Sequence, residues 1–300
     1  MGERPLQARD PAHDDQSSRL PQCNPKSGSK VVPEKARSEQ VRLEGDVKGI
    51  PPVVPLQDRN PTTRTAYVTY ALLVLNILVF VYELTLSPQE LGAFFREWAV
   101  VPAELTASFQ GEMTSSVRPE WVTLFTSQFL HGGFLHIAGN MLFLWVFGNN
   151  VEDRLGHVRY LIFYLTCGAL AALTQWFFDM ESTIPSLGAS GAIAGVLGAY
   201  ILRFPRAEVL TLVPLGIFIT TIYVPAWVFL GFWFVQQAFY GIASLQMTTN
   251  IGMEGGGIAY WAHAGGFVFG AILGPLLGLF VGKSPYDRQA ALRQREEELL

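Results

Sequence analysis

The chain has 300 residues, of which half are hydrophobic and 15% are charged, and its formal net charge is −4. The charged residues lie outside a few long apolar runs, which is the distribution of an integral membrane protein rather than of a soluble enzyme. The small net charge does not indicate a nucleic-acid partner, and the two cysteines, Cys23 and Cys167, do not indicate a disulfide framework.

Residues 1–62 are rich in Pro, Ser, Gln and charged side chains and show no sustained helical or strand period. Such a segment buries too little apolar surface to offset the entropy that it would lose on ordering. It also lacks the apolar core of a secretory signal peptide, and its acidic residues argue against a transit peptide. We therefore expect residues 1–62 to be a disordered extension.

Six apolar runs between residues 63 and 283 predict an all-α bundle of six membrane-spanning helices. The predicted spans are residues 66–86, 133–149, 160–178, 189–202, 226–243 and 258–281. The stretch 87–127 mixes aromatic with polar side chains and is expected to lie at the membrane interface. Residues 209–243 are too long for one helix and are divided by Pro214 and Pro225, so a short buried or interfacial piece should precede the fifth span. A charged tail, residues 284–300, follows the last span.

The basic residues predict the orientation of this bundle. Lys and Arg occur in the extension, in the tail, in the loop with Arg154 and Arg159 and in the loop with Arg203 and Arg206, whereas residues 179–187 and 246–257 contain none. Because Lys and Arg favour the cytoplasmic side, both termini should lie in the cytoplasm. The second, fourth and sixth spans then begin at the outer face.

Four polar residues stand at a similar depth in this topology: His136 and Asn140 in the second span, Ser190 in the fourth and His263 in the sixth. A polar side chain inside a span is costly and indicates a functional site, unless it only makes a hydrogen bond between helices. A serine paired with a histidine is the arrangement that makes a weak alcohol a nucleophile. His136 and Asn140 are four residues apart, so they share a helix face and can both donate to a developing oxyanion.

Small residues offer a way to bring Ser190 and His263 together. The sixth span carries Gly266, Gly270, Gly274 and Gly278, and the fourth carries Gly191, Ala194, Gly195 and Gly198. Such stripes allow two helix backbones to approach closely, and if they face each other the serine and the histidine meet. The alternative is a glycine zipper with incidental polar neighbours.

Three motifs contain these residues: HGGFLHIAGN at 131–140, GASG at 188–191 and AHAGG at 262–266. They resemble, in the same order, the signature regions of the rhomboid intramembrane serine proteases, and NVEDRLG at 150–156 is similar to a stretch that follows the second span in that family. The resemblance implies that Ser190 is the nucleophile, His263 the general base, and His136 and Asn140 the oxyanion donors. It further implies a structural role for His131 and a bracing role for Glu152 and Arg154 at the cytoplasmic end.

Two positions depart from the pattern of that family. Many members have a Trp-Arg pair in the first loop, whereas Trp121 is followed here by Val122. Some members stack an aromatic ring on the histidine from one turn after the serine, where this chain has Ala194. No aspartate within the spans is placed as a third member, so the sequence predicts a Ser–His dyad and identifies no residue that orients His263.

Other classes are weighed on the same residues. A metal-dependent membrane protease needs a His-Glu-x-x-His pair and an aspartyl protease needs two buried aspartates, and the sequence has neither. A small transporter that uses intramembrane His and Asn, and a catalytically silent relative that binds membrane clients, stay open as alternatives. The predicted protein is a serine endopeptidase of the bacterial cytoplasmic membrane that needs no metal or other cofactor, with single-span or other transmembrane proteins as its substrates.

Overall fold

The computed structural model describes residue 2 and residues 54–112, 114, 118–215, 218–246 and 259–282. The described residues from 54 onward belong to one compact unit, residues 51–300. The predicted charged tail 284–300 and the first 53 residues of the predicted extension, apart from residue 2, lie outside the described residues.

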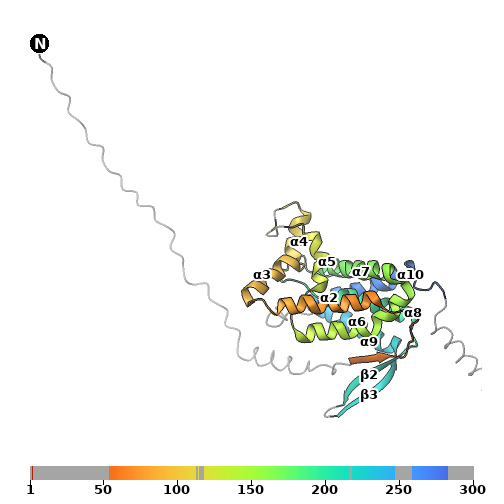
Figure 1. Ribbon diagram of the computed structural model, residues 1–300. Coiled ribbons are helices and arrows are strands. Elements are labelled where there is room, and N and C mark those ends of the chain that lie inside the picture. Colours follow the sequence, from red (N-terminus) through yellow and green to blue (C-terminus); the bar gives the residue numbers. More distant parts are fainter. Residues whose placement is uncertain are drawn as a thin grey trace, which may run out of the picture. The chain divides into compact units, whose positions relative to one another are not determined.

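Each of the six predicted spans is a helix, which confirms the helical bundle (Figure 1). The helices are α2 (Tyr67–Glu83), α6 (Phe134–Leu155), α7 (His157–Phe178), α8 (Ser190–Arg203), α9 (Ala226–Gln246) and α10 (Tyr260–Leu276). Helix α8 packs against α6, α7, α9 and α10. Every residue of α8 from Gly191 to Tyr200 is buried, as expected of a helix that is apolar on all sides and lies at the centre of a bundle.

Two of the described helices are by themselves long and apolar enough to cross a membrane: α7 and residues Ala226–Ser244 of α9. The pair Glu120–Phe129 and Phe134–Leu155, bent by 83°, is a third if it counts as one span, and α2 and α8 are shorter apolar helices. Large apolar side chains of α2, among them Val74 and Leu78, point outward and are exposed. A row of exposed apolar side chains is the surface expected of a helix that faces lipid.

Acidic side chains at the end of α6 cap the start of α2. Glu152 accepts hydrogen bonds from the backbone N–H groups of Val68 and Thr69, at 2.9 and 2.7 Å. Asp153 accepts from the backbone N–H groups of residues 63 and 64 at 3.0 and 2.8 Å. Helix α2 has no side-chain cap of its own, so α6 supplies acceptors that its first turn would otherwise lack.

Arg154 connects the end of α6 to the chain that follows α10. Its guanidinium donates to the carbonyl oxygens of Val281 and Gly282, at 2.5 and 2.6 Å. Two residues of one motif therefore hold the first and the last helix of the bundle, Glu152 at the start of α2 and Arg154 just after α10. These contacts agree with the bracing role that the resemblance implied for both residues.

The structure also contains a three-stranded antiparallel sheet, which the sequence analysis did not predict. Its strands are β1 (Val54–Asp58), β2 (Glu208–Leu215) and β3 (Phe218–Pro225), in the order β1-β2-β3. The piece expected before the fifth span is the β2–β3 hairpin, which projects from one end of the bundle in Figure 1. Its many Val, Ile and Thr residues favour an extended backbone.

The prediction that residues 1–62 are disordered is wrong for the part that forms β1. This strand pairs with β2, and Asp58 at its end accepts hydrogen bonds from the Tyr200 hydroxyl at 2.6 Å and the Asn150 side-chain amide at 2.8 Å. Burial raises the pKa of the Asp58 carboxyl to about 6, and the hydrogen bond from Tyr200 acts in the opposite direction. A local reading of composition misses β1 because its partner strand lies far along the sequence.

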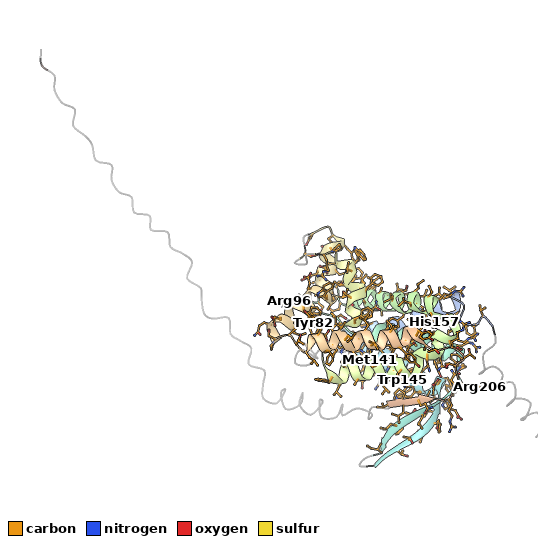
Figure 2. The ribbon with its side chains drawn as sticks, in the orientation of Figure 1. Tyr82, Arg96, Met141, Trp145, His157 and Arg206 are labelled. Carbon is orange, nitrogen blue, oxygen red and sulfur yellow. The ribbon has the colours of Figure 1, made fainter. Side chains whose placement is uncertain are left out.

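The stretch that was predicted to lie at the membrane interface forms short helices. They are α3 (Pro88–Trp98), α4 (Pro102–Phe109), η1 (Glu120–Val122), α5 (Thr123–Thr126) and η2 (Ser127–Phe129). Figure 2 shows Arg96 of α3 near Tyr82 at one end of the bundle, whereas His157 and Arg206 lie at the opposite end. The interfacial stretch and the β2–β3 hairpin thus occupy opposite ends.

Arg118 anchors the first loop even though Trp121 is not followed by arginine. The Arg118 guanidinium lies 3.2 Å from the centre of the Trp98 ring and 2.6 Å from the carboxylate of Glu97. Trp121 itself is 58% exposed. A charged group that both pairs with a carboxylate and stacks on an aromatic face is well suited to fix a loop.

Candidate active site

Ser190 is the first residue of α8, and the turn before it has a conformation that requires glycine. Gly188 has a φ of +127°, and its N–H donates to the Ser127 carbonyl at 2.9 Å. A Cβ atom at this position would lie 2.7 Å from Nε2 of His136, so no larger residue fits. The first N–H groups of a helix have no acceptor within the helix. Because α8 begins at Ser190, its free N–H groups lie beside the Ser190 hydroxyl.

The interfacial stretch fixes the chain that leads to this turn. Val100, which follows α3, and Ser186 exchange two backbone hydrogen bonds, at 3.1 and 2.7 Å. Val100 and Ser127, which both precede α6, thus hold the loop between α7 and α8 by bonding to Ser186 and Gly188. The position of Ser190 depends on the first loop as well as on α8 itself.

Helices α8 and α10 are in backbone contact through their glycines. A methyl group added at Gly266 would overlap the carbonyl of Gly191, and one added at Gly270 would overlap the backbone of Gly195. The two stripes therefore face each other, as the sequence suggested. Gly278 does not belong to this contact, because it lies beyond the end of α10 in a turn with a φ of +103°.

This close packing brings Ser190 and His263 together. Nε2 of His263 lies 2.8 Å from Oγ of Ser190, which is within hydrogen-bond distance. His263 stands in the first turn of α10, where its backbone N–H donates to the Ala259 carbonyl at 3.2 Å. The geometry allows the imidazole to accept the serine proton, which is the first requirement for a nucleophilic hydroxyl.

The length of α8 bears on how deep Ser190 would lie in a membrane. Helix α8 has 14 residues, which is about 21 Å and less than the ~30 Å of a hydrocarbon core. Its last residue, Arg203, favours the interface at the opposite end. If Arg203 marks one interface, Ser190 would lie roughly 10 Å below the other. The helix has the length of the fourth predicted span, residues 189–202, shifted by one residue.

His136 and Asn140 lie on α6, which packs against α8. The His136 ring is next to Gly188, as its close approach to that residue shows, and it also contacts the His131 ring edge-to-face at 5.1 Å between centroids. Asn140 is only 7% exposed, and among the described residues its side-chain N–H₂ group has no hydrogen-bond acceptor. A buried donor without an acceptor is unusual in a folded protein and fits a group that awaits a transient anion.

The structure reveals two residues near His263 that the sequence analysis missed, both on α9. Oε1 of Gln237 lies 2.8 Å from Nδ1 of His263. The Trp233 ring lies 5.7 Å from the His263 ring between centroids, at an angle of 33°. A glutamine in an otherwise apolar span was a signal of the same kind as Asn140, and it could have been found by the same reasoning.

No group of three or more His, Cys, Asp or Glu side chains that could hold a metal ion occurs within the described ranges.

Comparison with known proteins gives one family. A profile described as the rhomboid domain matches residues 118–280, more than half of the chain. The chain is 30% identical over 177 residues to "Rhomboid protein 1, mitochondrial" of Saccharomyces cerevisiae (57% of this chain, 46% of the relative). It is 34% identical over 196 residues to "Rhomboid protease GluP" of Bacillus subtilis (60% and 36%). It is 29% identical over 170 residues to "Rhomboid-like protein 11, chloroplastic" of Arabidopsis thaliana (55% and 56%).

The profile match includes all four candidate residues, His136, Asn140, Ser190 and His263. The chain spans only 36% to 56% of the length of these three relatives.

Proposed function

The chain belongs to the rhomboid family, and we propose that it is a serine endopeptidase that hydrolyses peptide bonds in or near transmembrane segments of other membrane proteins. The observation that carries this proposal is the 2.8 Å distance between Oγ of Ser190 and Nε2 of His263 inside an apolar bundle. A transporter would not need a serine hydroxyl aligned on an imidazole nitrogen, and a silent relative would not need to keep both groups. The alignment favours hydrolysis over either alternative.

In the proposed acylation step, His263 takes the hydroxyl proton of Ser190 on Nε2 while Oγ attacks the carbonyl carbon of the substrate. The carbonyl oxygen becomes an oxyanion, and His136, the Asn140 amide and the first N–H groups of α8 are the donors available to it. The imidazolium then gives its proton to the leaving amine as the C–N bond breaks. The product is an acyl ester on Ser190 and a free amine.

Deacylation repeats these roles with water. His263 takes a proton from a water molecule, the hydroxide attacks the ester carbonyl, and the proton returns to Oγ of Ser190 as the ester bond breaks. Water must therefore reach a level roughly 10 Å below the membrane boundary. Water at this level can form hydrogen bonds with the polar side chains of the site, which are His136, Asn140, Gln237 and His263.

The depth of Ser190 restricts the substrate. A peptide carbonyl in a regular membrane helix is hydrogen-bonded four residues along the chain and is covered by side chains, so Ser190 cannot attack it. The substrate must present an unwound segment near the Ser190 end of its span. Gly and Pro in that segment hold helix poorly and should favour cleavage, whereas Leu in their place should slow it.

We also propose that both termini lie in the cytoplasm, in a bacterial cytoplasmic membrane. Arg154 and Arg159 both contact the chain around 277–282, and Arg203 ends α8 at the same end of the bundle. This clustering of basic residues at one end supports a cytoplasmic location for that end. The Ser190 end then faces the outer side, and a substrate is cut on the non-cytoplasmic side of its midplane.

The proposal is tested with the purified protein and a single-span model substrate in detergent and in liposomes. Ser190→Ala and His263→Ala should each abolish cleavage while the protein stays folded. Ser244→Ala is a matched control, because the Ser244 hydroxyl only donates to the carbonyl of Gly241 in its own helix. Normal turnover by Ser190→Ala would refute the proposal.

The oxyanion donors are tested in the same assay. His136→Ala or Asn140→Ala should lower the rate by about 10- to 1000-fold, as the loss of one such donor does. If both variants keep the wild-type rate, these residues only pack. Mapping the product ends by mass spectrometry tests the entry side, and cuts near the cytoplasmic end of the substrate span would refute the proposed orientation.

A further inference from the structure

His263 is held from the side opposite Ser190 by a side chain of α9. Its Nδ1 atom lies 2.8 Å from Oε1 of Gln237, and Nε2 lies 2.8 Å from Oγ of Ser190. Gln237 is only 7% exposed, although α9 is one of the two helices that are apolar enough to span a membrane alone. A buried amide in such a helix is costly unless its hydrogen bonds are satisfied, so its partner indicates its purpose.

The two contacts of His263 are compatible with the tautomer that the proposed reaction needs. A neutral imidazole carries one N–H and one nitrogen lone pair. Nε2 can accept the serine proton only if it holds the lone pair, which places the hydrogen on Nδ1. The Nδ1–H then requires an acceptor, and the amide oxygen of Gln237 is an acceptor at the correct distance.

We propose that Gln237 is a positioning residue of the site, which fixes His263 in the Nδ1–H tautomer and aims its Nε2 at Ser190. The site is then a chain of three side chains, Ser190–His263–Gln237, rather than the dyad predicted from the sequence. The catalytic meaning of this assignment rests on the proposed function. During attack the proton moves from Oγ to Nε2, and the Nδ1 hydrogen stays on the ring and remains shared with Oε1 of Gln237.

Helix α9 also fixes the plane of the imidazole. Trp233 lies one turn before Gln237, so both side chains project from the same face of α9. The Trp233 ring packs against the His263 ring and also lies 6.2 Å from the Phe267 ring, one turn further along α10. Ala194 of α8 is too small to support the imidazole, and Trp233 provides an aromatic surface from the neighbouring helix instead. One helix thus supplies both the acceptor and the ring that hold the base.

A purely structural reading of Gln237 is that it only joins α9 to α10. Gln236 provides the matched control for this reading. It is the neighbouring residue with the same side chain, it is half-buried, and the hydrogen bonds found for the described residues do not connect it to His263. A general loss of polarity or of helix packing in α9 should affect both glutamines, whereas a loss of positioning should affect Gln237 alone.

The first measurement compares kinetics of Gln237→Met, Gln237→Glu and Gln236→Met on a model substrate. Methionine has a similar length but no acceptor oxygen, so kcat should fall by about 10- to 100-fold, part of the ~10²- to 10⁴-fold that a positioned base contributes. KM should stay unchanged, because Gln237 lies on the side of the His263 ring opposite Ser190. Gln237→Glu restores an acceptor oxygen and should keep more activity than Gln237→Met, and Gln236→Met should match wild type. Wild-type kcat in Gln237→Met would overturn the proposal.

The second measurement reads the tautomer directly, by ¹⁵N solid-state NMR of histidine-labelled protein in liposomes. The chain has five histidines, and His263 is assigned from a His263→Ala sample. Wild type should show the hydrogen on Nδ1, and Gln237→Met should shift the population toward Nε2–H. An unchanged tautomer in folded Gln237→Met, with a lower melting temperature, would show a structural role only. If Gln237→Met does not fold, an Nε2–H tautomer in wild type still overturns the proposal.

The two measurements separate this inference from the proposed function. If wild type neither cleaves a substrate nor reacts with a serine-directed fluorophosphonate, the proposed function fails. The tautomer shift between wild type and Gln237→Met then still shows whether Gln237 positions His263.

Discussion

Replacing Glu152 should show how much the fold depends on the cap that α6 provides for α2. The Glu152 carboxylate is only 1% exposed. It accepts hydrogen bonds from the N–H groups of Val68 and Thr69 and from the Thr69 hydroxyl, and its Oε1 lies 2.6 Å from Nδ1 of His157. Alanine at this position removes all of these interactions at once. Two backbone N–H groups and a buried hydroxyl then have no acceptor.

The expected loss follows from those groups. An unsatisfied buried donor costs about 1–3 kcal/mol, and removal of one partner from a buried charged network costs about 3–5 kcal/mol in all. For a domain of this size, 1 kcal/mol corresponds to about 2–4 °C, so Glu152→Ala should lower Tm by about 6–20 °C. Melting in detergent, followed by the helical circular dichroism signal, measures this.

The matched control is another helix cap in the same protein. Glu90 accepts from the backbone N–H of Ser87 at 2.8 Å in the capping box of α3, but this pair is exposed. Glu90→Ala removes a cap with little burial and should cost only about 1 kcal/mol. If Glu152→Ala lowers Tm no more than Glu90→Ala does, the cap from α6 is not a major source of stability, and the reasoning from burial is wrong.

Three further perturbations test separate parts of the account. Deleting residues 1–60 removes β1, so that variant should melt several degrees below one lacking only residues 1–52, and equal Tm values would show that β1 contributes nothing. The pKa of the Asp58 carboxyl is raised from 3.8 to about 6. The folded protein therefore binds the carboxyl proton more tightly than the unfolded chain does, and the free energy of unfolding should fall by up to about 3 kcal/mol between pH 4 and pH 7. Asp58→Asn should remove this decrease, and melting curves at several pH values show whether it does. Gly266→Ala places a methyl group against the Gly191 carbonyl and should abolish cleavage, and normal activity in this variant would contradict the α8–α10 contact.

The sequence predicted the six helices and identified the two small-residue faces through which α8 and α10 meet. Apolar runs long enough for a membrane are rare by chance, and glycines four residues apart mark the face that another backbone contacts. Ser190 and His263 come together because both lie beside those glycines. Local sequence was informative for these features because the spacing of the glycines marks the helix faces that pack together.

Features that depend on long-range pairing could not be predicted in this way. Strand β1 forms by pairing with the edge of β2, which lies about 150 residues later in the sequence. The sequence of neither strand indicates which strand it pairs with. The link between Gln237 and His263 likewise depends on how α9 is rotated against α10, which no local period determines.

The most direct test of the central claim is a covalent one. Wild-type protein in detergent is treated with a serine-directed fluorophosphonate, and the modified residue is identified by peptide mass spectrometry. A single adduct is expected on Ser190, because among the described residues this is the hydroxyl that lies 2.8 Å from an imidazole nitrogen. No adduct is expected in His263→Ala. Failure of the folded protein to label, labelling at another serine, or undiminished labelling of His263→Ala would contradict a Ser190 nucleophile activated by His263.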